Sequence, residues 1–359
     1  MQVVISGYYG FNNVGDEAIL FSIIQALRLQ DPSIKITVLS NNPDSTAKLY
    51  DVEAVNRWKL KEIINALKSA DGLISGGGSL LQDETGFRSV PYYSGIMKIA
   101  QWLHKPVFVY SQGMGPFNKS YSKWIVKSAL NKAKQITVRD EESKELLRSI
   151  GISKEISIVP DPVMGLSIGQ VKNTWLQERS FPESLICVSV RDWPTENHYK
   201  EKIALALDRC VENGVGVLFI PMHGKHDDLA SQEVAGLMKQ ESSIYPYDAS
   251  IEEKIDMIGK SDLLFGMRLH SLIFAAITYT PFIALSYDPK IDAFASRVKQ
   301  PVLGHVKDTG WDDETVFTEM ERMLEQRNNE RKKLIEIVEP LKEEAIHVAK
   351  SAIDVFHSK

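Results

Sequence analysis

The chain has 359 residues, of which 43% are hydrophobic and 25% are charged, and its formal net charge is −5. This length exceeds that at which one hydrophobic core usually stops growing, so two domains are expected, and the balanced composition excludes a disordered or fibrous protein. The acidic balance excludes a general nucleic-acid binder, because affinity for a phosphate backbone depends on clustered lysines and arginines.

The two cysteines, Cys187 and Cys210, each have an apolar residue beside them. They indicate neither a disulfide framework nor a thiolate metal site, so we expect two buried free thiols. The N-terminus enters a strand at Val3 without a secretion signal, and no stretch approaches eighteen uninterrupted apolar residues. We therefore expect a cytoplasmic protein.

Short β-branched runs alternate with helical patterns in the first half of the chain. The predicted strands are 3–6, 34–39, 72–75, 107–110, 136–138 and 156–159, and a helix is predicted over about 16–29. Such alternation is typical of a parallel sheet joined by crossover helices. The alternation of strand and helix patterns stops between Asp161 and Glu183, which predicts that the interdomain link lies there. An N-terminal Rossmann-like domain is therefore expected over 1–170.

A second series of strands is predicted at 186–190, 217–220, 263–265 and 282–285, and the tail from 312 to 358 has helical spacing. We expect a C-terminal Rossmann-like domain with a helical tail over 183–359. The predicted fold class is α/β, with two doubly wound domains facing a cleft. Ligands of such sheets bind beyond the carboxyl ends of the strands, so the strand exits are where chemistry is expected.

Glycine-rich loops follow two of the predicted strands. The loop 6–17 lacks the G-x-G-x-x-G spacing, and Asp16 at the helix start disfavours an anion there, so we assign this loop to a sugar rather than to a dinucleotide. Gly76, Gly77 and Gly78 follow the strand 72–75 and let backbone N–H groups approach a ligand closely. A tight turn is the alternative, but three consecutive glycines exceed what a turn needs.

Cationic and titratable residues follow other strands. Arg139 ends the strand 136–138, and a guanidinium suits bidentate binding of carboxylate or phosphate; pairing with the acidic residues after it is the alternative. Arg268 and His270 stand two apart, after the strand 263–265 and before an apolar helix. A cation and a titratable group that share one turn favour a functional site. Asp192 follows the strand 186–190.

The stretch from His223 to Asp228 contains metal-ligand residue types, but Lys225 separates its two histidines. We expect an ordinary polar loop and no metal site there.

Lys119, Lys123 and Lys127 fall on one face of a predicted helix that also carries Trp124. An ordinary solvated face and a contact with anionic lipid are the two interpretations.

Five separated motifs together resemble the polysaccharide pyruvyltransferase family, and the likeness is closest to its CsaB-type cell-surface anchoring members. The motifs are 5–11 with 15–17, 75–78, 138–140, 159–162 and 268–271. The resemblance extends from residue 1 to about residue 300.

The resemblance implies a glycosyltransferase-B-like fold and ketal-pyruvyl transfer from phosphoenolpyruvate (PEP). It implies an undecaprenyl-diphosphate-linked disaccharide as the acceptor, with N-acetylmannosamine receiving a ketal that S-layer proteins bind, and hence peripheral contact with the membrane surface. Arg139, Arg268, His270 and Lys290 correspond to the PEP site, and Asp192 to a catalytic carboxylate. No cofactor is implied.

The residue chemistry agrees with this resemblance. PEP carries a phosphate and a carboxylate, which require cations from more than one direction. His270 can protonate the PEP methylene near neutral pH, and Asp192 can accept a proton from a sugar hydroxyl. A nucleotide-sugar-dependent glycosyltransferase of cell-wall synthesis is the alternative, since the fold is shared. A non-catalytic module that binds anionic glycans is a second alternative.

Overall fold

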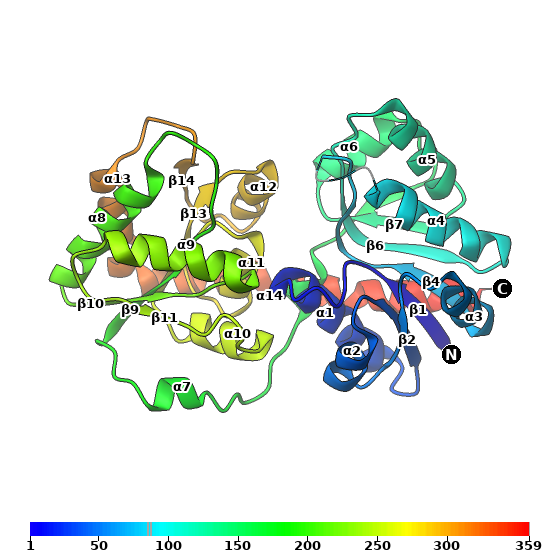
Figure 1. The fold of residues 1–359 in the computed structure, drawn as a ribbon, viewed down its shortest axis with the longest axis horizontal. Helices are drawn as coiled ribbons and strands as arrows, with labels where there is room; N and C mark the ends of the chain where they lie inside the picture. The colour runs from blue at the N-terminus through cyan, green and yellow to red at the C-terminus, as the bar shows by residue number, and fades with distance from the viewer. Residues whose placement is uncertain (85, 87, 359) are drawn as a thin grey trace. The chain divides into compact units, whose positions relative to one another are not determined.

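The computed structural model describes residues 1–84, 86 and 88–358, and Figure 1 shows their ribbon. The chain forms two compact units. The first contains residues 1–166 and the C-terminal stretch from Leu341, and the second contains Ser167–Pro340. The boundary after Leu166 falls within the predicted link of 161–183.

The first unit is built on an eight-stranded parallel sheet. Its main order is β3-β2-β1-β4-β6-β7-β8, and β5 pairs with β6. The strands are β1 (Gln2–Ser6), β2 (Lys35–Ser40), β3 (Glu53–Asn56), β4 (Gly72–Ser75), β5 (Gly78–Leu81), β6 (Val107–Met114), β7 (Gln135–Val138) and β8 (Ile156–Ile158). The six predicted strands are confirmed. The sequence did not predict β3 and β5, which are short and only partly apolar.

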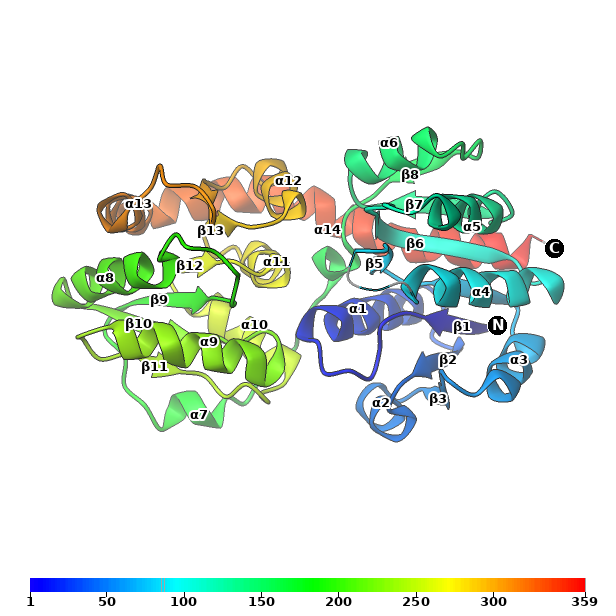
Figure 2. The ribbon, with the colours of Figure 1, turned by 45° about the horizontal axis from the view of Figure 1, so that its top comes forward.

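Helices cover both faces of this sheet. They are α1 (Val14–Gln30), α2 (Pro43–Tyr50), α3 (Leu60–Ser69), α4 (Ser89–Trp102), α5 (Ser120–Leu130), α6 (Glu141–Ser149) and the short 3₁₀ helix η1 (Pro162–Gly165). Residues of α3, α4 and α5 form one buried core with alternate residues of the strands, such as Leu73 and Val109. Figure 2 shows α4 and α5 side by side over β6.

The second unit has a six-stranded parallel sheet of order β11-β10-β9-β12-β13-β14. The strands are β9 (Ser184–Ser189), β10 (Val215–Phe219), β11 (Ser243–Ile244), β12 (Leu263–Gly266), β13 (Phe282–Ser286) and β14 (Val302–His305). The four predicted strands are confirmed, and β11 and β14 are added at the two edges. Both units are therefore doubly wound α/β domains, as predicted.

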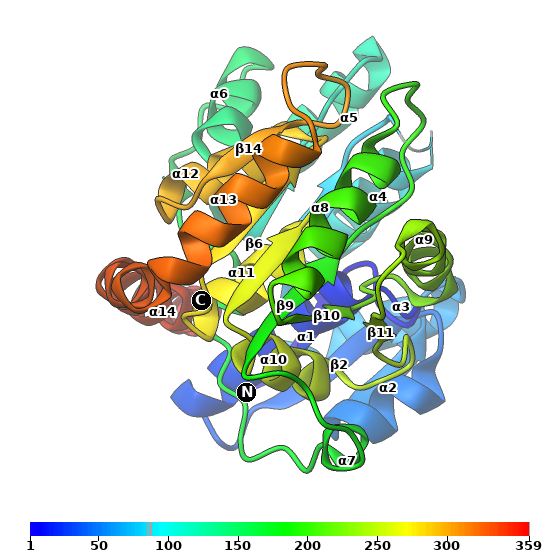
Figure 3. The ribbon, with the colours of Figure 1, turned by 90° about the vertical axis from the view of Figure 1, so that its left-hand side faces the viewer.

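The helices of the second unit pack in two layers. They are α7 (Thr174–Gln177), α8 (Tyr199–Glu212), α9 (Gly224–Leu237), α10 (Ile251–Gly259), α11 (Leu269–Ile277), α12 (Pro289–Arg297) and α13 (Asp313–Glu325). Helix α8 contacts α9 and α13 on one face of the sheet, and α11 contacts α10 and α12 on the other. Figure 3 shows α8 and α13 side by side in front of this sheet.

The tail differs from the prediction in where it packs. The long helix α14 (Arg327–His357) contains Pro340, which is the last residue of the second unit, and the turns after it belong to the first unit. Phe356 lies against Gly72 at the start of β4, at only 2.3 Å from where a side-chain carbon on that glycine would stand. The predicted tail of the second domain, up to residue 359, is thus shared between the two units.

Cys187 and Cys210 are buried free thiols, as predicted. Across the part of the chain that the structure describes, no helix combines the length and apolar character needed to cross a bilayer.

Candidate functional site

The glycine loop of the first unit adjoins Asp16 at the carboxyl edge of its sheet. Gly78 has a φ of +88°, and a side chain there would meet the Asp16 carboxylate at 3.0 Å. Gly77 packs against Ile19 and Pro162, and Gly76 against the hydroxyl of Tyr9. All three glycines therefore have a packing reason to lack a side chain, which is the physical reason for the unusual sequence at this exit.

Arg139 lies beside the same loop. Its Nη2 donates to Ser79 Oγ at 3.0 Å, its Nε lies 3.4 Å from Asp140, and its Nη1 lies 3.6 Å from Asp161. The guanidinium is largely buried, and a side chain at position 113 would stand 2.6 Å from its Nη2. The five predicted site residues of the first unit, Asp16, Gly76, Gly77, Gly78 and Arg139, thus form one cluster.

The carboxylates beside Arg139 are themselves fixed by backbone groups. Asp140 caps α6 by accepting from the Ser143 N–H at 2.7 Å, and Asp161 caps η1 by accepting from the Val163 N–H at 3.1 Å. The expected pairing of Arg139 with an acidic neighbour is therefore present. Asp161, which follows β8, is a second partner that the order of the chain alone did not indicate.

In the second unit, Arg268 is held by a carboxylate from another strand exit. Its Nε donates to Asp227 Oδ2 at 2.9 Å, and its Nη2 donates to Asp227 Oδ1. Asp227 lies in the first turn of α9 and is 1% exposed, whereas Arg268 is the residue that directly precedes α11. This side-on pair leaves Nη1 of Arg268 outside it. It also fixes the guanidinium in one plane.

Two titratable groups close to this pair have perturbed protonation. Burial and the positive charge of Arg268 lower the pKa of His223, which directly precedes α9. Burial lowers the pKa of Lys254 to about 8, even though the Asp227 charge opposes this change. Lys254 is fully buried on α10, and its ammonium donates to the carbonyls of Pro221 and Tyr247, each at 2.8 Å.

The remaining predicted residues of the second unit lie at exits on the same edge of the sheet. His270 is half-buried in the first turn of α11, two residues after Arg268. Lys290 opens α12 after β13, and its ammonium contacts Asp288 at 2.7 Å. Asp192 follows β9 and is exposed; it accepts from Lys200 at 2.7 Å. Among the described residues, the ion pairs of Asp192 and Lys290 are with Lys200 and Asp288, so Asp192 and Lys290 share with Arg268 an edge of the sheet rather than a contact.

Arg191 is a cation at this edge that the sequence-based site did not include. Its guanidinium lies 4.3 Å from the ring centroid of Tyr287 and 5.1 Å from that of Trp193. Because Arg191 follows β9 and Tyr287 follows β13, this contact links two exits on either side of β12. The sequence did contain a signal for Arg191, because this residue closely follows an apolar strand.

The loop discounted as a metal site begins a helix in the structure. The rings of His223 and His226 are 5.6 Å apart, and α9 starts at Gly224. Within the described residues, no group of three or more His, Cys, Asp or Glu side chains is arranged to hold a metal ion.

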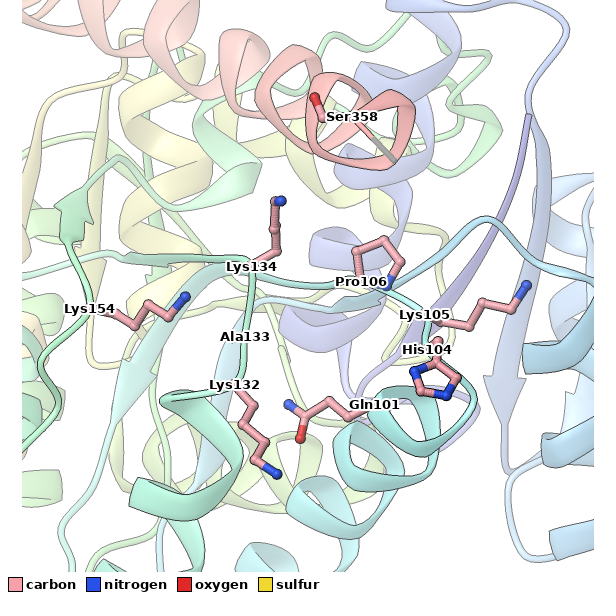
Figure 4. Close-up of a pocket in the computed structure, with 9 residues that line it drawn as sticks. All are labelled: Gln101, His104, Lys105, Pro106, Lys132, Ala133, Lys134, Lys154 and Ser358. Atoms are coloured by element: carbon pink, nitrogen blue, oxygen red, sulfur yellow. The ribbon is translucent and has the colours of Figure 1, made fainter.

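A basic hollow of about 540 Å³ lies on the first unit, at the amino ends of its strands (Figure 4). Its lining residues are Gln101, His104, Lys105, Pro106, Lys132, Ala133, Lys134, Lys154 and Ser358. Most of them immediately precede β6, β7 and β8, which places the hollow on the opposite edge of the sheet from Arg139. It is therefore separate from the candidate site.

The fold is shared with sugar-nucleotide enzymes. Similar solved structures include a UDP-N-acetylglucosamine 2-epimerase of Neisseria meningitidis (TM-score 0.67, 12% identity, all of both chains covered). A putative UDP-N-acetylglucosamine 2-epimerase of Listeria monocytogenes is also similar, with a TM-score of 0.68 and 14% identity over 99% of this chain and 96% of that chain. A glycosyltransferase of Rickettsia africae is similar as well, with a TM-score of 0.62 and 12% identity over 99% of this chain and 97% of that chain. At these identities the likeness concerns the fold alone, and it confirms the glycosyltransferase-B type.

The sequence comparisons identify the family. AmsJ, an amylovoran biosynthesis protein of Erwinia amylovora, is 21% identical over 358 residues, with 81% of this chain and 84% of AmsJ covered. The family model described as polysaccharide pyruvyl transferase matches residues 13–289, which include Asp16, Arg139 and His270. The chain therefore belongs to the polysaccharide pyruvyl transferase family and is a transferase.

Proposed function

We propose that this protein transfers pyruvate from PEP onto N-acetylmannosamine in an undecaprenyl-diphosphate-linked precursor of a secondary cell-wall polysaccharide, and that the resulting ketal supports the anchoring of S-layer proteins. Membership of the pyruvyl transferase family supports the coarse reaction. The observation that carries the choice of PEP is the set of cations at strand exits of the second sheet, where the guanidinium of Arg268 is oriented by Asp227.

The proposed donor matches the charge of this edge. PEP presents a phosphate and a carboxylate, and guanidinium groups are the side chains best suited to both. Arg268 offers the Nη1 that its pair with Asp227 does not use, and Lys290 adds an ammonium that contacts Asp288. The resemblance assigns Arg139 to PEP as well, and its guanidinium is similarly oriented by carboxylates.

In the proposed reaction, His270 first donates a proton to the methylene carbon C3 of PEP. The C2–C3 double bond becomes a methyl group on an oxocarbenium-like C2. The oxygen of one sugar hydroxyl bonds to C2, and a carboxylate, proposed as Asp192, accepts its proton. Asp192 is exposed and contacts Lys200, so it must exchange that ion pair for the hydroxyl.

A second sugar hydroxyl then bonds to C2, while the bond from C2 to the phosphate-bearing oxygen breaks. Inorganic phosphate leaves with the bond electrons and takes up the proton of the second hydroxyl. Asp192 returns the first proton to His270, so the catalytic groups are restored. These steps use cations and proton carriers of the chain itself, and we expect activity to persist in EDTA.

A lipid-linked acceptor requires access to a membrane surface, and α5 offers a suitable face. Lys119, Lys123 and Lys127 are exposed there, together with Tyr121 and Trp124. Trp124 is 71% exposed, which is unusual for an indole on a helix of a packed domain. Lysines attract anionic headgroups, and amphipathic aromatic rings favour the interface.

The proposed function is tested by incubating the protein with PEP and a synthetic lipid-linked disaccharide. The expected result is release of inorganic phosphate and a product whose mass has increased by a pyruvate ketal. Thermal shift assays separate the donor classes, because PEP should stabilise the protein whereas UDP-sugars should not. Stabilisation by a UDP-sugar, together with transfer of its sugar, would favour the glycosyltransferase alternative.

A further inference from the structure

Aromatic rings are exposed at the carboxyl edge of the first sheet. After β1, the rings of Tyr8 and Phe11 stack with 4.1 Å between centroids and 7° between planes. After β3, Trp58 is 63% exposed, and Tyr8 is 39% exposed. We call Tyr8, Phe11 and Trp58 the aromatic shelf. Exposed aromatic groups that gather on strand-exit loops indicate a binding surface.

A buried arginine joins the two halves of the shelf. Arg57 is 3% exposed, and the carbon centre of its guanidinium lies 5.2 Å from the Phe11 ring centroid and 5.1 Å from that of Trp58. Tyr92 and Tyr93 enclose the same guanidinium, at 4.5 and 5.5 Å. Such cation–π contacts strengthen where water is excluded. The shelf is thereby fixed before any ligand arrives.

Hydrogen bonds set the positions of the loops that carry the rings. Arg57 Nη1 donates to the Gly7 carbonyl at 2.8 Å, which ties the first loop to the end of β3. Trp58 Nε1 donates to Asn41 Oδ1 at 2.9 Å, which fixes the plane of the indole. A preorganised surface of this kind loses little conformational entropy on binding.

The shelf is continuous with the glycine loop through Tyr9. The ring of this fully buried tyrosine lies where side chains on Gly7 and Gly76 would otherwise stand. Burial, followed by the nearby Asp16 carboxylate, raises the pKa of the Tyr9 hydroxyl well above its usual value. Tyr9 therefore packs between Gly7, which precedes Tyr8 of the shelf, and Gly76 of the glycine loop.

We infer that the aromatic shelf is a binding subsite for a pyranose ring of the acceptor. A pyranose ring has an apolar C–H face that packs on a flat aromatic ring, and hydroxyls around its rim. Asn12, which follows Phe11 in the chain, and Asn41, which accepts a hydrogen bond from Trp58, are exposed and can offer amide groups to those hydroxyls. Asp16 and Glu17 lie in the first turn of α1, where their carboxylates disfavour a nucleotide phosphate at the start of that helix.

This inference rests on the proposed function only for the identity of the acceptor, so binding is measured without PEP. The probe is a water-soluble disaccharide that ends in N-acetylmannosamine, titrated calorimetrically into wild type, Tyr8→Ala, Trp58→Ala and Trp58→Phe. We expect Tyr8→Ala and Trp58→Ala to weaken binding about tenfold, the scale of one aromatic contact, and Trp58→Phe to restore much of it. Trp102→Ala, which removes another exposed indole at the end of α4, is the matched control and should bind as wild type does.

Steady-state kinetics then separate the two hypotheses. Shelf variants should raise the KM for the disaccharide and leave the KM for PEP unchanged. A wild-type enzyme that transfers pyruvate while shelf variants keep their disaccharide affinity would overturn the inference and leave the proposed function standing. The wild-type protein could fail to transfer pyruvate from PEP while the shelf variants bind the disaccharide more weakly. That result would support the sugar subsite and reject PEP as the donor. Loss of UDP binding instead of disaccharide binding would make the shelf a nucleotide platform and overturn the inference.

Discussion

The guanidinium of Arg268 and the carboxylate of Asp227 form a two-point pair, with 2.9 Å between Arg268 Nε and Asp227 Oδ2. The two residues follow β12 and β10, and β9 lies between these strands in the sheet. Asp227 also accepts from the backbone N–H of Met222 at 3.3 Å, so the carboxylate is fixed by its own loop. Arg268 is therefore oriented by a group that is itself held in place.

Replacing this carboxylate should impair the use of PEP without unfolding the protein. Asp227→Asn keeps the shape of the side chain but removes the charge that orients Arg268. A misplacement of about 1 Å can cost about 10²-fold in rate, so we expect a fall of 10- to 100-fold in kcat/KM for PEP. Asp228→Asn makes the same change one residue later, where the partner is Gln232, and should have little effect. Equal effects of the two substitutions would contradict the positioning role.

His270→Gln tests the proposed proton donor. Glutamine keeps a hydrogen-bond donor near the same place but cannot transfer a proton, so turnover should fall about 10²- to 10⁴-fold while the melting temperature stays near that of wild type. In deuterated solvent, the methyl group of the wild-type ketal should contain one solvent deuterium, measured by mass spectrometry. Near-wild-type turnover of His270→Gln would reject His270 as the acid, and Lys290 would be the next residue to test.

The sequence predicted the strand exits well because an apolar run followed by a charged residue is a local signal. Arg139 and Arg268 were found in this way, and both occupy the carboxyl edges of their sheets. Their partners were harder to find. Asp227 lies 41 positions before Arg268, and only the order of strands in the sheet brings the two together. Arg57 was missed because β3, Glu53–Asn56, is too short and polar to be recognised as a strand.

Helical spacing predicted the tail but not its packing. The pattern of α14 shows which residues face a core, whereas it carries no information about which core that is. The structure assigns the turns before Leu341 to one unit and the later turns to the other. Contacts such as that of Phe356 with Gly72, which lie far apart in the chain, determine this division.

Lys254 should make stability depend on pH. Burial lowers the pKa of its ammonium to about 8 in the folded protein, from the usual lysine value of 10.5. Between these values the unfolded chain binds more protons, so the stability of wild type should rise as pH increases from about 8 to 10.5, by up to about 3 kcal/mol. Below pH 8 both states are protonated and the destabilisation is fully present. The free energy of unfolding, measured in urea from pH 8 to 10.5, should rise in wild type relative to both Lys254→Met and Lys254→Gln. A difference between wild type and the variants that stays constant with pH would contradict the lowered pKa of Lys254.

The α5 face should contribute to membrane binding. Lys119→Glu/Lys123→Glu/Lys127→Glu should weaken co-sedimentation with vesicles containing anionic lipid, because lysines near such a surface contribute about 1 kcal/mol each, or roughly 100-fold for three. Lys132→Glu/Lys134→Glu/Lys154→Glu makes the same change in net charge at the basic hollow, at the amino ends of the strands, and is the matched control. Trp124→Ala should weaken binding to the same vesicles without changing the charge. Loss of binding in the hollow variant alone would move the membrane contact to that edge, and unchanged binding by the α5 variant would leave its lysines as an ordinary solvated face.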